Sequence, residues 1–273
     1  MLHEQINLWA SGEGCAKLDI YVPYDPLAEN SAKSRPNKCV LVLPGGGYEF
    51  CSPREAEPVA LAFASKGFSA FVLWYTVEST AGRKGLHPQP LLDASKAVCL
   101  IRENASKWRV DPENIAVCGF SAGGHLAASL GVFWDEAYIK EALGIKGGEN
   151  RPDKIILSYA VLNGLPGVRH DGSFENLLGA GRESDYLKLS PADNVNEKTP
   201  PAFIWHIADD ACVKVENALL FASKLSANKI PFEMHIYESG QHGMSIADEI
   251  VGTPDCHVKS WLELCINWLN KSF

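Results

Sequence analysis

A serine flanked by glycines is the residue whose setting points most directly to chemistry. The G-x-S-x-G sequence at 119–123 has Ser121 at its centre, follows the apolar run 114–118 and precedes an Ala- and Leu-rich segment, 124–134. A strand, a sharp turn and a helix in this order form the context in which such a sequence presents a nucleophile. The turn strains the serine backbone and exposes its hydroxyl, while the glycines leave room for strand and helix. We therefore predict that Ser121 is a catalytic nucleophile.

A histidine late in the chain has the setting of the general base that a serine nucleophile needs. Of the eight histidines, His242 alone combines a late position, a loop directly after the β-type run 232–237 and glycines on both sides. Flanking glycines let an imidazole project from a short loop. We expect His125, on the helix after the serine, to make a structural hydrogen bond, and His206 to have a core or supporting role. His170 is expected in an exposed loop, where contact with a substrate is an alternative.

Two adjacent aspartates, Asp209 and Asp210, follow the apolar run 202–207. A serine–histidine pair needs an acid that holds the tautomer and orientation of the imidazole. An acid at this position gives the order Ser, Asp, His along the chain, which suits a G-x-S-x-G nucleophile. Adjacent aspartates also occur as helix caps and in solvated turns, so the residues alone leave both interpretations open.

Three consecutive glycines, 45–47, follow the apolar run 39–43. Backbone amides of such a run can stabilise the negative oxygen that forms when a hydroxyl attacks a carbonyl. We assign these donors to Gly46 and Gly47, together with the amide of Ala122 beside the serine. A phosphate-binding loop is the rival interpretation, but the chain lacks the Gly-Lys-Ser/Thr ending and the G-x-G-x-x-G spacing. A purely structural tight turn also stays open.

Apolar runs that alternate with helix-like segments predict the scaffold. We expect strands at 17–22, 39–43, 68–75, 114–118, 155–160, 202–207 and 232–237, and helices at 54–66, 91–108, 124–134, 216–227 and 261–269. This order predicts an α/β fold with a mainly parallel sheet of about eight strands and helices on both faces. The loops singled out above then lie at the carboxyl ends of strands, where function gathers in such sheets.

Smaller features complete the expected organisation. The run 17–22 is expected to be an edge strand, 25–38 a surface loop and 111–113 a turn. Residues 1–273 contain no linker, repeat or low-complexity tract and are expected to form one domain. The segment 162–201 is dense in Gly, Asp, Asn and Pro, and so long an irregular stretch can cover an active site.

Composition narrows the class of protein. The formal net charge of -8 argues against nucleic acid or an anionic membrane as the main partner. No signal peptide and no membrane span is recognised. The eight cysteines form neither C-x-x-C pairs nor metal-type Cys/His clusters, which favours reduced thiols in the cytoplasm. The chemistry predicted above requires no metal and no organic cofactor.

The chain resembles the α/β-hydrolase superfamily, in particular its small esterases related to acetyl-xylan esterases and hormone-sensitive-lipase-like enzymes. The resemblance rests on Pro44-Gly45-Gly46-Gly47-Tyr48, Gly119-Phe120-Ser121-Ala122-Gly123-Gly124-His125-Leu126, Asp210-Ala211-Cys212-Val213 and Gly240-Gln241-His242-Gly243. In that family the acid precedes a valine by three residues, which implies Asp210 rather than Asp209. Pro44 stands where hormone-sensitive-lipase relatives usually have His. In this respect the chain resembles the carbohydrate-esterase branch instead. Lys214 follows the valine of the aspartate loop, at a position where many relatives have proline.

The resemblance implies a serine esterase whose substrate is a small ester with a short acyl group, such as an acetylated sugar. No long apolar lid is present, which disfavours a lipase. Tyr48, Trp74 or Tyr75 can line a sugar-binding face, although aromatic residues near strand ends usually pack internally; we select Tyr48 and Tyr75 as candidates. An amidase or small peptidase with the same Ser121, His242 and Asp210, or a non-catalytic binding protein of this fold, are the alternatives. The oligomeric state cannot be predicted.

Overall fold

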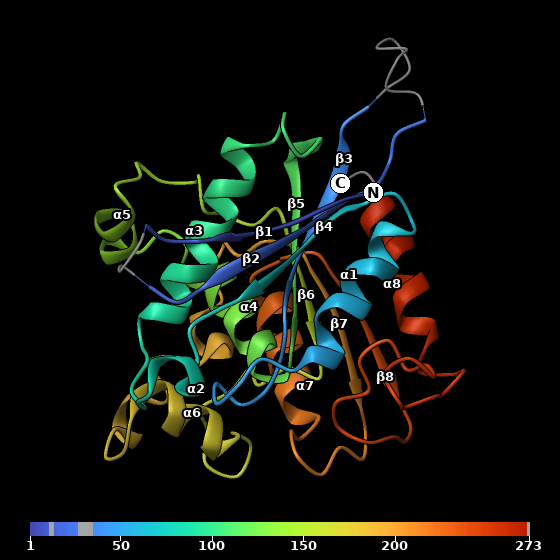
Figure 1. Ribbon diagram of the computed structural model, residues 1–273. Coiled ribbons are helices and arrows are strands. Elements are labelled where there is room, and N and C mark those ends of the chain that lie inside the picture. Colours follow the sequence, from blue (N-terminus) through green and yellow to red (C-terminus); the bar gives the residue numbers. More distant parts are fainter. Residues whose placement is uncertain (11–13, 27–34, 272–273) are drawn as a thin grey trace.

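One mainly parallel sheet forms the centre of the computed structural model, which describes residues 1–10, 14–26 and 35–271 (Figure 1). Within these residues the sheet has eight strands in the order β1-β2-β4-β3-β5-β6-β7-β8. The strands are β1 (Leu2–Asn7), β2 (Lys17–Val22), β3 (Asn37–Leu43), β4 (Ser69–Trp74), β5 (Val110–Phe120), β6 (Lys154–Ser158), β7 (Ala202–Ile207) and β8 (Phe232–Tyr237). β1 and β2 pair antiparallel, as do β2 and β4, and every other pair is parallel. The predicted fold class is confirmed.

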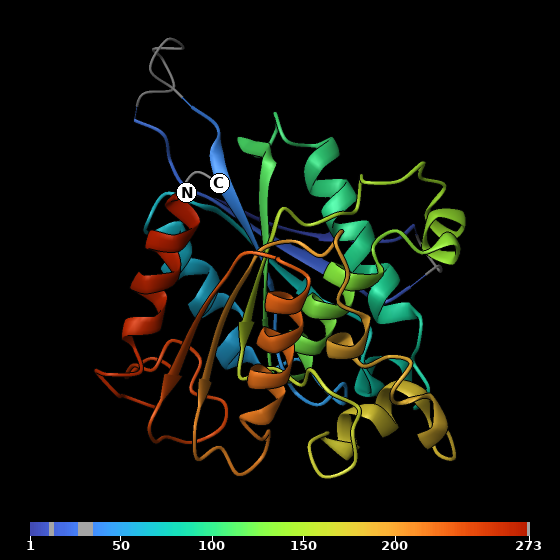
Figure 2. The same ribbon diagram turned by 180° about the vertical axis from the view of Figure 1, so that it is seen from behind.

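Helices cover both faces of this sheet (Figures 1 and 2). The helices of the described residues are α1 (Glu57–Ala64), α2 (Glu78–Ala81), α3 (Gln89–Glu103), α4 (Ser121–Phe133), α5 (Ala137–Leu143), α6 (Asp171–Leu178), α7 (Glu216–Ala227) and α8 (Ser260–Asn270), with 3-10 turns η1 (Pro53–Glu55), η2 (Glu183–Asp185) and η3 (Pro191–Asn194). Side chains of α1 and α8 pack on one face, and those of α3, α4 and α7 pack on the other. The alternation of buried strands with amphipathic helices produces these layers.

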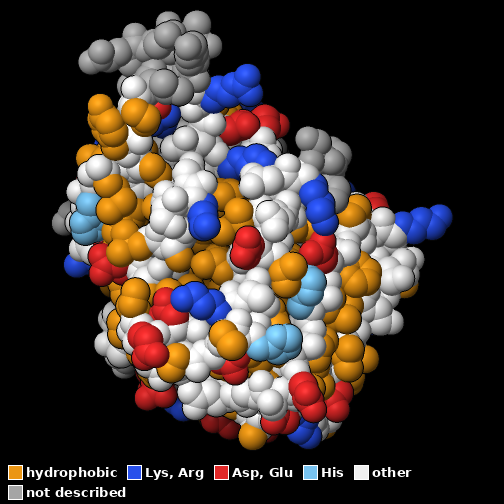
Figure 3. Space-filling view, turned by 90° about the vertical axis from the view of Figure 1, so that its right-hand side faces the viewer, with side chains coloured by type: hydrophobic (Ala, Val, Ile, Leu, Met, Phe, Trp, Pro, Cys, Tyr) orange, Lys and Arg blue, Asp and Glu red, His pale blue; other side chains and the backbone are white. Residues whose placement is uncertain are grey.

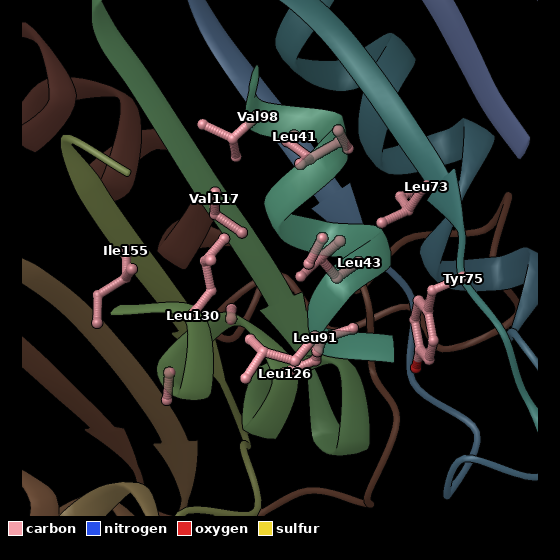
Figure 4. Packing of buried hydrophobic residues seen from close by; sticks show 14 of the residues in the cluster. Leu41, Leu43, Leu73, Tyr75, Leu91, Val98, Val117, Leu126, Leu130 and Ile155 are labelled. Atoms are coloured by element: carbon pink, nitrogen blue, oxygen red, sulfur yellow. The ribbon is translucent and has the colours of Figure 1, made fainter. Parts of the chain in front are cut away.

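The central strands are buried on both faces because almost every residue in them is apolar. Figure 4 shows one side of this core, where Leu41 and Val117 of the sheet meet Val98 of α3 and Leu130 of α4. All four side chains are fully buried. Each contributes on the order of 1.5–3 kcal/mol by leaving water. This core fixes β3, β5 and α4, the elements that carry the glycine run and the serine.

Three local predictions are corrected. The strand 17–22 is not an edge strand, because β1 pairs along its whole length and takes the edge. The residues 111–113 belong to β5 instead of a separate turn; the Asp111 carboxylate accepts the Glu113 amide (3.1 Å) where the register with β3 shifts. The predicted helix 91–108 starts at Gln89 and ends at Glu103 as α3.

The long segment 162–201 is more regular than its sequence pattern indicates, since it contains α6, η2 and η3. Figure 1 shows α6 beyond the carboxyl ends of the parallel strands, next to α2. Phe174, Leu178 and Tyr186 of this segment form a small buried cluster with Val161 and Val213. Of the predicted loop 25–38, residues 27–34 lie outside the described residues.

The distribution of surface charge, the character of the helices and the state of the cysteines bear on the classes of partner that the composition argues against. Figure 3 shows one face of the molecule, on which acidic and basic side chains are interspersed with hydrophobic ones. No helix in the described ranges combines the length and the apolar character that a bilayer span demands. All eight cysteines are free, and four of them are buried.

Candidate active site

Ser121 lies at the junction where β5 ends and α4 begins, in a backbone conformation that is rare outside glycine. Its φ angle is 51°, which costs a non-glycine residue about 1–2 kcal/mol. The neighbouring glycines permit the turn: a Cβ on Gly119 would lie 2.1 Å from the carbonyl oxygen of Gly123. A Cβ on Gly123 would lie 2.1 Å from the carbonyl oxygen of Leu43. The strained strand–turn–helix junction predicted from the sequence is therefore present.

The three side chains predicted to form a catalytic unit form one hydrogen-bonded chain. His242, in the loop after β8, places Nε2 2.9 Å from the Oγ of Ser121. Its Nδ1 lies 2.7 Å from Oδ2 of Asp210, in the loop after β7. The carboxylate accepts a hydrogen bond from Nδ1–H, which leaves Nε2 of a neutral imidazole free to accept a hydrogen bond from the serine hydroxyl. Hydrogen-bonded partners that lie 32 and 121 positions apart in the chain thus meet at the carboxyl edge of the sheet.

The structure separates the two adjacent aspartates. The side chain of Asp210 is fully buried, and its Oδ1 accepts the amides of Cys212 (2.8 Å) and Val213 (2.9 Å). Burial alone raises the pKa of this carboxyl, but hydrogen bonds from His242 and from the two amides outweigh it and lower the pKa below its usual value. Asp209 is exposed and its Oδ1 accepts the amide of Gly240 (3.0 Å), which starts the histidine loop. Geometry therefore favours Asp210 as the partner of the imidazole.

The glycine run after β3 brings a bare stretch of backbone beside the serine. A Cβ on Gly45 would lie 3.0 Å from the Cβ of Ser121. Gly46 and Gly47 adopt φ angles of 122° and 65°, and within the described part of the chain neither amide donates to a protein acceptor. Ala122 lies in the first turn of α4, where amides have no partner inside the helix. These are the amides predicted to stabilise an oxyanion, a role that stays a prediction.

We expect Gly46→Ala to lower kcat about 100-fold or more, because the new Cβ would lie 2.1 Å from the carbonyl oxygen of Phe50 and must displace the loop. Loss of one oxyanion donor costs about 3–4 kcal/mol in the transition state. Gly47→Ala is the milder comparison: the new Cβ meets no atom within 4 Å, but the φ angle of 65° is strained for alanine by about 1–2 kcal/mol, so we expect a loss of about tenfold. Steady-state kinetics with p-nitrophenyl acetate measure both variants, and a folded Gly46→Ala variant that keeps kcat within threefold of the parent would contradict the assignment.

The two tyrosines selected as substrate contacts are both buried. Tyr48 and Tyr75 are 1% exposed. The hydroxyl of Tyr48 lies 2.7 Å from Nδ1 of His125, and the hydroxyl of Tyr75 donates to the carbonyl oxygen of Pro44 (2.6 Å). Burial and internal hydrogen bonds disfavour a contact with substrate; Tyr75 instead holds the residue that precedes the glycine run, and Tyr48 holds His125. His125 makes the structural hydrogen bonds expected of it, with Leu189 as its second partner (3.0 Å).

His206 is a buried imidazole on β7 whose Nδ1 accepts the amide of Ile207 (3.1 Å) and whose Nε2 has no hydrogen-bond partner. Burial lowers the pKa of His206 to about 4, as it does the pKa of His125. An unfolded histidine has a pKa of about 6.5. Between these values the unfolded chain binds the proton and the folded chain does not. Stability is therefore lost as pH falls from about 6.5 towards 4.

We expect His206→Asn to flatten this pH dependence, because asparagine can still accept the Ile207 amide but does not titrate. The loss in the free energy of unfolding between pH 7 and pH 5 should be smaller in the variant by about 2 kcal/mol. Urea unfolding at both pH values measures it, with the exposed His257→Asn as control. An unchanged pH dependence in His206→Asn would show that folding does not lower the pKa of this imidazole.

The segment 162–201 touches the site through backbone and side-chain hydrogen bonds. Asn176 of α6 donates its side-chain amide to the carbonyl oxygen of Gly47 (3.0 Å). His170, the residue before α6, is partly exposed and caps this helix by accepting the amide of Ser173 (3.2 Å). Burial, and then the nearby imidazole of His242, lower the pKa of His170. The segment thus adjoins both the glycine run and the histidine loop.

Two buried residues beside the site are not among those predicted from the sequence. Glu55 of η1 accepts the amide of Gly45, and Tyr159, directly after β6, packs its ring on that of His242 with centroids 5.0 Å apart. Tyr159 lies near the end of the predicted strand 155–160 and directly after the observed β6, at the carboxyl edge of the sheet, so the rule used for the other loops could have found it. Glu55 carries no comparable local signal. No group of three or more His, Cys, Asp or Glu side chains suited to a metal ion occurs among the described residues.

The strand order and the strained serine between β5 and α4 define an α/β-hydrolase fold. The chain belongs to the BD-FAE family, whose profile matches residues 18–225. It is 37% identical to the acetyl ester-xyloside bifunctional hydrolase from Caldicellulosiruptor lactoaceticus; the match covers 97% of this chain and 94% of that chain, with a TM-score of 0.84. The resemblance to small α/β-hydrolase esterases is confirmed.

Curated relatives agree with this family. The chain is 42% identical over 214 residues to endo-1,4-beta-xylanase B of Butyrivibrio fibrisolvens, a match of 77% of this chain and 33% of that protein. It is 26% identical over 246 residues to the acetylxylan esterase of Xylanibacter ruminicola, a match of 88% and 46%. The chain thus spans less than half the length of these two relatives. It is an α/β-hydrolase related to carboxylic ester hydrolases.

Proposed function

We propose that the chain hydrolyses short-acyl carboxylic esters through Ser121, His242 and Asp210. The observation that carries this proposal is the unbroken hydrogen-bonded chain from the buried Asp210 through the imidazole to the serine hydroxyl. A serine hydroxyl is a weak nucleophile until an adjacent base takes its proton. The buried carboxylate holds the imidazole in the tautomer that can do so.

The reaction runs in two half-reactions. Nε2 of His242 takes the proton as Oγ of Ser121 bonds to the ester carbonyl carbon, whose oxygen becomes negative and rests on the amides of Gly46, Gly47 and Ala122. The intermediate collapses, the alcohol leaves with the proton from His242, and an acyl-enzyme remains. Water then gives its proton to His242 and attacks the acyl carbon, and collapse returns the proton to Ser121 and releases the acid.

The proposed substrate class is an acetylated carbohydrate. Two named relatives, an acetylxylan esterase and an acetyl ester-xyloside hydrolase, act on such compounds by their names, and this supports the proposal for the present chain. We also propose that the segment 162–201 covers the site, because Asn176 of α6 is hydrogen-bonded to the glycine run. A cover over one side would favour a small acyl group and leave the alcohol to extend outwards.

Acetate release from acetylated xylo-oligosaccharides tests the substrate class. We expect turnover of this substrate and of p-nitrophenyl acetate, with much slower release from p-nitrophenyl octanoate and from an aryl acetamide. Deacetylated oligosaccharide serves as the blank. Preference for the acetamide would make the chain an amidase, and preference for the octanoate would remove the short-acyl assignment. A folded chain that hydrolyses none of the four would point to a binding protein of the same fold.

A further inference from the structure

A buried glutamate joins two of the loops that form the candidate active site. Glu55 ends the short turn η1 and is 4% exposed. Its Oε2 accepts the backbone amide of Gly45 (2.8 Å), and its Oε1 accepts the hydroxyl of Tyr159 (2.6 Å). Both oxygens are therefore engaged, one by the glycine run and one by the residue that follows β6.

Burying an ionisable carboxyl at this position is unfavourable for the stability of the fold. Burial raises the pKa of Glu55 above its usual value, although the hydrogen bonds from Tyr159 and Gly45 act in the opposite direction. A buried charge costs stability unless its partners compensate, and apolar or neutral groups of similar size are often as stable. The requirement that retains a carboxylate here is consequently one of geometry or charge rather than of packing alone.

The hydrogen bond from the Gly45 amide to Glu55 fixes the start of the glycine run. A Cβ on Gly45 would lie 2.7 Å from Oε2 of Glu55 and 3.0 Å from Cβ of Ser121, so the glycine is held closely between the carboxylate and the nucleophile. A hydrogen bond from an amide to a charged acceptor is about twice as strong as one between neutral groups. It orients the peptide that leads into the amides of Gly46 and Gly47.

The hydrogen bond from the Tyr159 hydroxyl connects Glu55 to the loop that carries His242. Tyr159 has a φ angle of 36°, a fully buried side chain and a ring set edge-on to that of His242. Besides donating to Glu55, its hydroxyl accepts the amide of Ser245 (2.9 Å). Arg54, the neighbour of Glu55, donates to the carbonyl oxygen of Gly243 (2.9 Å). The turn at 53–55 therefore contacts two neighbours of the imidazole, the ring of Tyr159 and the backbone of Gly243.

We propose that Glu55 is a positioning residue for the reaction proposed above: its carboxylate holds the Gly45 amide and the Tyr159 hydroxyl, so that the oxyanion amides and the imidazole keep a fixed geometry around Ser121. Its negative charge also attracts the imidazolium that forms when His242 takes the serine proton. The inference rests on the proposed function, because it assigns Glu55 a part in the same site.

Glu55→Gln tests this with little change of shape. The side-chain amide can accept the Gly45 proton but offers no charge, and it leaves the Tyr159 hydroxyl without an acceptor. We expect kcat for p-nitrophenyl acetate to fall about 10- to 100-fold while KM changes less than threefold, because the affected interactions strengthen only in the transition state. The melting temperature should stay equal or rise, since a neutral group replaces a buried charge.

Three further variants separate positioning from folding. Tyr159→Phe keeps the ring and removes the hydroxyl, so kcat should fall about tenfold with KM unchanged. Glu55→Ala should lose more than Glu55→Gln, and the exposed Glu57→Gln should lose nothing. An active parent whose Glu55→Gln variant retains kcat, raises only KM, or loses activity in proportion to melting temperature would overturn the inference and leave the proposed function standing. An inactive parent would overturn both.

Discussion

Replacing Ser121 with alanine is expected to lower kcat/KM for p-nitrophenyl acetate by about 10⁵-fold or more, the effect that removal of a nucleophile has in other serine hydrolases. The hydroxyl lies 2.9 Å from Nε2 of His242, and no other hydroxyl approaches this nitrogen among the described residues. Alanine keeps the backbone turn and the apolar packing of α4. We therefore expect the folded structure and the melting temperature to be retained.

Ser129→Ala is the matched control for this variant. Ser129 lies two turns further along α4, is also buried, and its Oγ is 3.5 Å from Nδ1 of His125. We expect less than a threefold change in kcat/KM. Circular dichroism and thermal melts of both variants confirm that the comparison is made between folded proteins. Residual activity of Ser121→Ala near the parent level would assign the nucleophile elsewhere.

Exchanging Asp210 for asparagine should reduce kcat about 10³- to 10⁴-fold, whereas Asp209→Asn should reduce it less than fivefold. Asparagine at 210 keeps the acceptor for the Cys212 and Val213 amides but turns an N–H towards Nδ1 of His242. The imidazole then adopts the tautomer with its proton on Nε2, which cannot accept the serine hydroxyl. Asparagine at 209 can still accept the Gly240 amide.

The two aspartate variants change neighbouring positions in the chain, but only Asp210 is hydrogen-bonded to the imidazole. Steady-state kinetics with p-nitrophenyl acetate, together with thermal melts, measure both. The reverse order of effects would transfer the role of the acid to Asp209. Equal, small effects would mean that the imidazole keeps its orientation without either carboxylate.

Much of the fold could be predicted because its signals are local. The bounds of β7, β8 and α7 agree with the predicted ranges 202–207, 232–237 and 216–227, in which apolar spacing matches the element. β1 was missed because its sequence, LHEQIN, is mostly polar and its residues are exposed or half-buried at the sheet edge. Edge strands lack the continuous apolar run that marks a central strand.

The same distinction between local and non-local signals applies to the residues of the candidate site. Ser121, His242 and the glycine run stand in short motifs whose backbone requirements appear in the sequence itself. Glu55 acts through Tyr159, which lies 104 positions away, so only the folded chain brings the two together. The sequence predicts Tyr48 as a substrate contact because aromatic residues suit both sugar-binding faces and hydrophobic cores. Its burial depends on packing against His125, which the sequence does not specify.

Covalent labelling with a fluorophosphonate probe is the most direct test of the proposed nucleophile and base. The probe reacts with an activated serine hydroxyl and stays bound to it. Peptide mass spectrometry of the labelled chain should find one adduct, on the peptide that contains Ser121, and a folded His242→Ala variant should take up little label. A folded parent that takes no label, or carries it on a different residue, would contradict the account.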